Sequence, residues 1–145
     1  MSSIEDILTA EEENEIVEAI KTAERKTSGE IRIHIESTAP EEAIERAAEV
    51  FHMLEMHKTE HRNGVLIYVA VDSRVFVIYG DKGINEVVPD GFWDSTRDII
   101  QKHFKSGDFK QGIIEGILKS GEQLKKYFPW DPGDENELPD EISKG

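Results

Sequence analysis

The sequence predicts an α/β protein, a three-layer α/β/α sandwich around a small mixed sheet of three to four strands. Two observations carry this prediction. The apolar runs at residues 65–71 and 75–79 are continuous rather than alternating, which is typical of strands covered on both faces. Segments with helical spacing of apolar residues lie before, between and after the predicted strands, so helices are available for both faces of the sheet.

The 145 residues are predicted to form a single domain over residues 9–130. A short N-terminal extension, residues 1–8, precedes it. An acidic tail, residues 131–145, follows it and has six carboxylates, one lysine and little apolar surface to bury, so we expect the tail to be disordered. The chain has no cysteine, which excludes disulfides and thiolate chemistry.

The first helix and the first strand are predicted near the N-terminus. Thr9 and Glu12 have the spacing of a capping box, and apolar residues then recur at helical intervals over residues 10–26. In the strand that opens at Glu30, isoleucines alternate with polar residues. The polar set is Arg32, His34 and Glu36. We therefore expect this strand to lie near the sheet edge, with one wetter face.

The next three elements set the topology of the sheet. A second helix, residues 41–56, connects the first strand to the run at 65–71, and a strand–helix–strand order normally makes the two strands parallel. Only residues 72–74 separate the two apolar runs, too few for a crossover helix, so these runs should form an antiparallel hairpin. Three loops should then meet at one end of the sheet, bringing together Gly29, Glu30, Asn63, Gly64, Gly80 and Asp81.

The C-terminal half is predicted to be helical. Residues 84–88 are either irregular or a short fourth strand. Asp90 is a candidate cap for a helix over about residues 92–103, and Asp108 is a candidate cap for a last helix from residue 109. Three glycines in the last helix would weaken it unless it packs closely against another element. They are Gly112, Gly116 and Gly121.

Net charge and apolar content indicate which classes of partner and which location to expect. The formal net charge is -14, with 31 acidic against 17 basic residues, so nucleic acid and anionic membranes would repel the protein, whereas cations and basic proteins would be attracted. No apolar run approaches the ~20 residues of a membrane span. The start of the chain has neither the basic nor the long apolar region of a signal peptide. We expect a cytoplasmic protein.

Several segments, in order, resemble the TPM domain family, a domain shared by a thylakoid-lumen phosphatase-like protein, a photosystem II repair factor and a nematode acetylcholine-receptor modulator. The matching segments are Thr27–Ile31, Thr59, Arg62–Tyr68, Gly80–Ile84 and Phe92–Trp93. The resemblance extends over roughly residues 9–129 and implies an α/β/α sandwich. Acid phosphatase activity is attributed to a plant member, and many members carry an export signal and a membrane anchor. This chain looks like a stand-alone soluble version.

Acidic residues gather in or beside the two loops, residues 57–63 and 81–91, that hairpin pairing brings together. The candidates are Glu60, Asp81, Glu86, Asp90 and Asp94, with Glu30 on the neighbouring strand. Carboxylates about 6 Å apart repel one another by roughly 1 to 3 kcal/mol per pair, and a bound cation reverses that sign. Oxygen ligands favour Ca²⁺ or Mg²⁺. The sequence therefore predicts a divalent-metal site, and the alternative left open is a solvated face of an acidic protein.

Two functions follow from these residues. The first is a metal-responsive regulatory or protein-interaction domain. The second is a metal-assisted acid phosphatase, in which the same carboxylates hold a cation that activates water for attack on a phosphomonoester. The sequence has no Gly-x-Ser-x-Gly elbow, no phosphate-cradling Gly-x-x-x-x-Gly-Lys loop and no dinucleotide fingerprint, so no catalytic residue is assigned.

Overall fold

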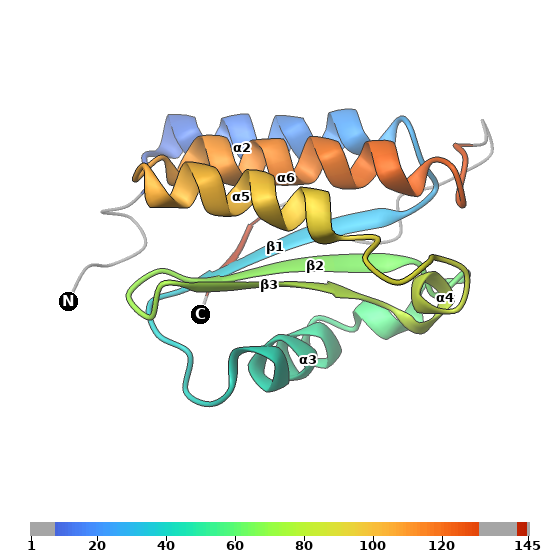
Figure 1. The fold of residues 1–145 in the computed structure, drawn as a ribbon, viewed down its shortest axis with the longest axis horizontal. Helices are drawn as coiled ribbons and strands as arrows, with labels where there is room; N and C mark the ends of the chain where they lie inside the picture. The colour runs from blue at the N-terminus through green and yellow to red at the C-terminus, as the bar shows by residue number, and fades with distance from the viewer. Residues whose placement is uncertain (1–7, 131–141, 145) are drawn as a thin grey trace.

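Helices cover both faces of a mixed four-stranded sheet in the computed structural model, which describes residues 8–130 and 142–144. Helices α2, α5 and α6 lie on one face and α3 on the other, as Figure 1 shows, and this arrangement confirms the predicted α/β/α sandwich. The elements are α2 (Ala10–Glu24), β1 (Glu30–Glu36), α3 (Ala43–Met53), a 3₁₀ turn (Met56–Lys58), β2 (Gly64–Ala70), β3 (Val75–Gly80), α4 (Lys82–Asn85), α5 (Asp94–Lys105), α6 (Phe109–Leu124) and β4 (Ser143–Lys144).

The strands follow the order β3-β2-β1-β4. Strand β1 pairs in parallel with β2, from Glu30 beside Gly64 onwards, as the connecting helix α3 requires. Strands β2 and β3 form the predicted antiparallel hairpin, with Val65 beside Gly80. The starts of β1 and β2 and the end of β3 therefore lie at the same end of the sheet.

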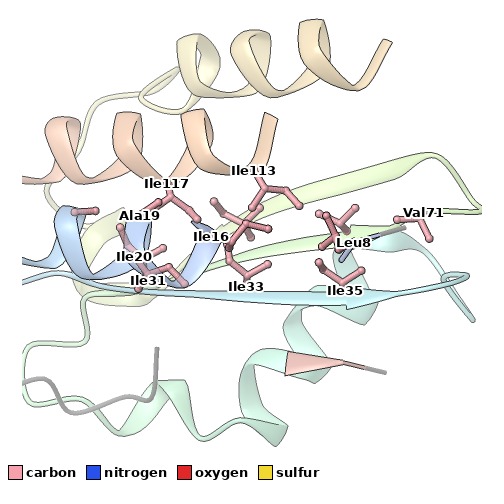
Figure 2. Packing of buried hydrophobic residues seen from close by; sticks show 13 residues of the cluster. Leu8, Ile16, Ala19, Ile20, Ile31, Ile33, Ile35, Val71, Ile113 and Ile117 are labelled. Carbon is pink, nitrogen blue, oxygen red and sulfur yellow. The ribbon is translucent and has the colours of Figure 1, made fainter. Parts of the chain in front are cut away.

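Helix α2 begins at the predicted capping box. The Glu12 amide donates to the Thr9 hydroxyl at 3.1 Å, and the Thr9 amide donates to the Glu12 carboxylate at 3.0 Å. The buried stripe of α2 faces the isoleucine row of β1 and the apolar face of α6, and Figure 2 shows these side chains together. They include Ile16, Ile20, Ile31, Ile33, Ile113 and Ile117.

Close packing explains the glycines of α6. A Cβ atom at Gly121 would lie 2.8 Å from the Ala23 Cβ, and one at Gly116 would lie 2.6 Å from the Ile100 Cδ1. Real Cβ contacts are longer than this, so α6 approaches α2 and α5 at a distance that only glycine allows. The predicted close packing of this helix is confirmed.

The expected wetter face of β1 is wrong, because all seven residues of the strand are buried. Arg32, His34 and Glu36 are exposed by only 8%, 4% and 4%. The strand is not at the sheet edge over its second half, since β4 pairs with it there. Helix α3 also contributes Arg46, which contacts Glu36. The alternating pattern correctly separated two faces of β1, but both faces are covered.

The fourth strand comes from the C-terminal segment rather than from residues 84–88. Ser143 pairs with His34, and Lys144 pairs with Ile35, in parallel with β1. The Lys144 ammonium also lies 2.6 Å from the Glu13 carboxylate of α2. Residues 131–141 of the predicted tail lie outside the described residues.

Residues 81–94 form a short helix and a series of turns. Helix α4 begins at Lys82, and the carboxylate of its N-cap Asp81 accepts from the Lys82 amide. Of residues 84–88, Ile84 and Asn85 belong to α4, so neither alternative holds for them, whereas residues 86–88 form turns and match the irregular alternative. Asp90 does not cap α5. The N-cap residue is Trp93, and its side chain makes no capping hydrogen bond. Gly91 turns the chain there, with φ +78°.

Candidate functional site

Backbone contacts join three loops at the end of the sheet where β1 and β2 begin. The Glu30 amide donates to the Asn63 carbonyl at 3.2 Å, and the Asp81 amide donates to the Gly64 carbonyl at 2.9 Å. The Asn63 side-chain amide reaches the Ser28 carbonyl at 3.2 Å. The predicted meeting of these loops is confirmed.

An ion pair between a half-exposed arginine and a buried aspartate connects the loop at 57–63 to α4. The Arg62 Nε and Nη2 atoms donate to the two carboxylate oxygens of Asp81 at 3.0 and 3.1 Å. Asp81 is only 4% exposed, and the Lys82 amide donates to its Oδ1 at 2.6 Å. The hydrogen bonds that Arg62 donates to Asp81 raise the pKa of Arg62, so the guanidinium stays charged. Asp81 is therefore held by protein donors on both oxygens.

The remaining candidates differ in their exposure and in their partners. Asp94 is exposed and lies 3.3 Å from Arg97, and Glu86 is exposed and lies 3.8 Å from Lys82. Glu60 and Asp90 are exposed, whereas Glu30 is buried at 4% exposure. Among the residues that the structure describes, no three carboxylate or imidazole side chains stand close enough together to hold a metal ion as they are.

The structure does bring Asp90 and Asp94 into the same surroundings. Both line two adjoining depressions of about 400 and 270 Å³ on the segment after α4. Phe92 lines both depressions, and its ring lies 5.6 Å from that of Tyr127. The Gln123 side-chain amide donates to the Phe92 carbonyl at 2.8 Å. The turn is thus fixed to α6, with two carboxylates at its surface.

An unsatisfied hydroxyl lies in the other loop. Thr59 is 4% exposed, and its Oγ1 has no hydrogen-bond partner within residues 8–130 and 142–144. Buried polar atoms normally have a partner, and this hydroxyl oxygen is free to accept one, such as a water molecule. Oxygen is also the ligand type that Ca²⁺ and Mg²⁺ prefer.

A second polar cluster, which the sequence did not predict, is centred on Glu36. Arg46 donates to both carboxylate oxygens, from Nη2 at 2.9 Å and from Nε at 3.0 Å. The Tyr68 hydroxyl donates to Oε2, and His34 Nε2 lies 3.1 Å from Oε1. The His34 Nδ1 atom lies 2.9 Å from the Ser143 hydroxyl of β4. We call these five residues the Glu36 network.

Burial and hydrogen bonds act in opposite directions on this carboxylate. Burial alone would raise the pKa of Glu36, but hydrogen bonds from Arg46, Tyr68 and His34 outweigh it and lower the pKa to about 2. Burial, followed by the hydrogen bond to Glu36, raises the pKa of Tyr68, and burial lowers the pKa of His34. Four donors engage the carboxylate, which leaves it no further strong acceptor site. The Glu36 network therefore joins α3, β1, β2 and β4.

The sequence pattern indicated only part of the Glu36 network. The polar face of β1 marked His34 and Glu36, whereas Tyr68 lies inside a continuous apolar run and Arg46 lies on a helix ten residues away. Only the packing of α3 onto the sheet brings them together.

None of the helices in the described part of the chain is both long and apolar enough to cross a bilayer.

Comparisons with known proteins place the chain in a family. A protein-family model described as "TPM domain" matches residues 2–123. The NMR structure of the BA42 protein from the psychrophilic bacterium Bizionia argentinensis is 60% identical over the whole of both chains, with a TM-score of 0.93. The NMR structure of the N-terminal domain of a P. gingivalis protein, 20% identical, covers 84% of this chain and 79% of that chain with a TM-score of 0.68, and so shares the fold. A search of curated proteins gave no match. The chain belongs to the TPM domain family.

Proposed function

We propose that this TPM domain is a divalent-cation-responsive module that binds Ca²⁺ or Mg²⁺ where residues 57–63 meet residues 81–94. The observation that carries the proposal is the buried, unpartnered hydroxyl of Thr59 in the first loop. The loop also contacts α4 through the Arg62–Asp81 pair, so a cation there acts on both segments. Carboxylates, a hydroxyl and backbone carbonyls form a set of hard oxygen ligands.

Arg62 acts as a built-in competitor in this proposal. Its guanidinium contacts both oxygens of Asp81, so a cation that takes Asp81 as its central ligand has to displace Arg62. Arg62 is half-exposed and can turn toward solvent. Asp90 and Asp94 would close the second loop, and Glu60, Glu86 or Glu30 would complete the coordination. Binding would therefore rearrange the contact between the two loops, which is what a responsive module needs.

The regulatory part of the proposal concerns a protein partner. Val87 and Tyr127 are 51% and 38% exposed, although both are large apolar side chains. Val87 lies in the segment between α4 and α5, and Tyr127 contacts Phe92 beside the two depressions. A cation that rearranges residues 81–94 would alter this apolar surface, so we propose a cation-dependent contact with a basic, partly apolar protein.

Calcium titration of the chelator-stripped protein, followed by two-dimensional amide NMR, tests the cation site. We expect saturable shifts confined to residues 57–63 and 81–94. Calcium at 100 times its dissociation constant should add about 2.7 kcal/mol to the free energy of unfolding. Asp81→Asn keeps an oxygen for the helix cap but removes the charge, so it should abolish saturation. Asp98→Asn removes an exposed carboxylate of α5 and is the matched control, with unchanged affinity.

Thr59→Val separates ligation from folding in the same titration. Valine has the shape of threonine without the hydroxyl, and because the hydroxyl has no protein partner its loss should leave the stability of the calcium-free protein nearly unchanged. The affinity for calcium should fall severalfold. Calcium shifts that are weak and spread over the whole surface, or an affinity that Asp81→Asn leaves intact, would remove the site from these loops.

The second candidate function is a metal-assisted acid phosphatase, which the name of the matching family model, TPM_phosphatase, supports. The same cation would activate water for attack on a phosphomonoester. Release of the phenol from an aryl phosphate, measured from pH 4 to 8 with Ca²⁺ or Mg²⁺ present, should disappear in Asp81→Asn and persist in Asp98→Asn. Turnover that is equal in both variants would assign the activity to another site or to a contaminant.

A further inference from the structure

A groove lies at the opposite end of the sheet from the loops at 57–63 and 81–94. It has a volume of about 750 Å³ and runs between the tip of the β2–β3 hairpin and the corner where α5 meets α6. Figure 1 shows the hairpin tip and this corner on the same side of the molecule, and α4 on the other side. We call it the hairpin groove. Its volume falls in the range of small-molecule sites, about 300 to 1,000 Å³.

Aromatic rings form an apolar wall in the hairpin groove. The Phe104 ring lies 5.4 Å from Phe76 and 5.0 Å from Phe109, measured between ring centroids. All three residues are only half-buried, although they come from β3, α5 and α6 and meet at one point. Apolar surface left in contact with water is unfavourable, so an apolar ligand gains free energy by covering it.

Two cations stand at the same groove. Arg74 lies at the hairpin tip and Lys105 in the last turn of α5, and both line the groove and are exposed. Within the described residues neither side chain has an ion-pair or hydrogen-bond partner. Asp72 is the one carboxylate in the lining, and it has an interaction of its own. The groove thus carries a net positive charge on a protein whose net charge is -14.

Backbone conformation fixes one of these cations in place. Arg74 has φ +56°, a left-handed conformation that residues other than glycine and asparagine rarely adopt. Its amide donates to the Val71 carbonyl at 3.3 Å, which closes the hairpin turn. The turn therefore holds the start of the Arg74 side chain beside the groove.

We propose that the hairpin groove binds a small amphipathic anion, with an apolar chain or ring against the three phenylalanines and one carboxylate or phosphate head between Arg74 and Lys105. Charge complementarity decides the sign of the head group, because the lining contributes two cations and one engaged carboxylate. This site is separate from the proposed cation site, and neither proposal depends on the other.

The test is a titration of the calcium-free full chain with decanoate, below its critical micelle concentration, followed by amide NMR. We expect saturable shifts confined to residues 69–76 and 101–109. Lys105→Glu should weaken the apparent affinity at least tenfold. Lys102→Glu is the matched control, because Lys102 lies in the same last turn of α5 but outside the groove, and its affinity should stay within twofold of the wild type.

Decylammonium, which has the same chain and the opposite charge, distinguishes an anion site from a merely apolar surface. It should cause no saturable shifts at residues 69–76 and 101–109. Equal binding of decylammonium there, equal weakening by the two lysine variants, decanoate shifts elsewhere on the molecule, or no saturation at all would each overturn the proposal.

Discussion

Glu36→Gln should lower the free energy of unfolding by about 3 kcal/mol at pH 7. The carboxylate accepts hydrogen bonds from Arg46, Tyr68 and His34 inside the protein, and an amide group can accept at only one of its two ends. Arg46 keeps its contact with Glu49 but loses its ion pair with the buried Glu36 carboxylate, and removing one partner of a buried ion pair costs about 3 to 5 kcal/mol in measured cases. The low pKa of about 2 against an ordinary value of 4.5 corresponds to a similar figure, about 3 kcal/mol. Urea unfolding measures it.

The matched control is Glu49→Gln. Glu49 also accepts a hydrogen bond from Arg46, but its side chain is 50% exposed. Exposed ion pairs contribute between 0 and about 1 kcal/mol, so this variant should change stability by less than about 1 kcal/mol. Equal losses of unfolding free energy in the two variants would mean that the burial of Glu36 adds nothing to the strength of its ion pair with Arg46.

The same comparison predicts a pH dependence. Because the pKa of Glu36 is lower in the folded protein than in the unfolded chain, its contribution is present in full above about pH 4.5 and is lost as the pH falls toward 2. The difference in unfolding free energy between wild type and Glu36→Gln should therefore shrink from about 3 kcal/mol at pH 6 to less than 1 kcal/mol near pH 2.5. The other carboxylates titrate in both proteins, so their contributions to the pH dependence cancel in this difference. A gap that stays constant with pH would show that the ionised form is not what stabilises the fold.

Local rules account for how much of the fold was predictable. Three features were predicted correctly because each depends only on residues close together in the sequence. They are the continuous apolar runs of β2 and β3, the short turn between these strands, and the capping box of α2. Coverage of β1 was not predictable in this way. It depends on α3 crossing the sheet and on Ser143 and Lys144, more than a hundred residues along the chain, lying beside His34 and Ile35.

In the candidate site, too, backbone placement was predictable and side-chain contacts were not. Strand pairing alone predicted that Glu30, Asn63, Gly64, Gly80 and Asp81 meet, because register places backbone atoms. Strand pairing could not predict which side chain forms an ion pair with the Asp81 carboxylate. The partner is Arg62, whose φ of +50° turns the chain just before β2, and no periodicity in the sequence marks such a turn.

Gly83→Ala should be the most damaging change at the meeting of the loops, with a loss of about 3 kcal/mol. A Cβ atom there would lie 2.5 Å from the Arg62 carbonyl oxygen and nearer still to that of His61, and backbone atoms cannot turn aside as a side chain can. Overpacking of this kind costs about 1 to 3 kcal/mol, occasionally more, and outweighs the roughly 1 kcal/mol that alanine gains over glycine in a helix. Gly80→Ala is the control, because its Cβ would meet nothing nearer than 3.5 Å.

Urea unfolding and amide hydrogen exchange over residues 59–64 separate two consequences of Gly83→Ala. If α4 is pushed away from the first loop, the Arg62–Asp81 pair lengthens, and exchange in the loop should rise while exchange in α2 changes only with global stability. A loss of stability with unchanged loop exchange would mean that the clash is absorbed within α4. A loss no larger than in Gly80→Ala would contradict the close packing of Gly83 on the loop. Since the proposed cation site needs both loops, a Gly83→Ala protein that still folds should also bind calcium more weakly, which ties the packing of one glycine to the function proposed for this end of the sheet.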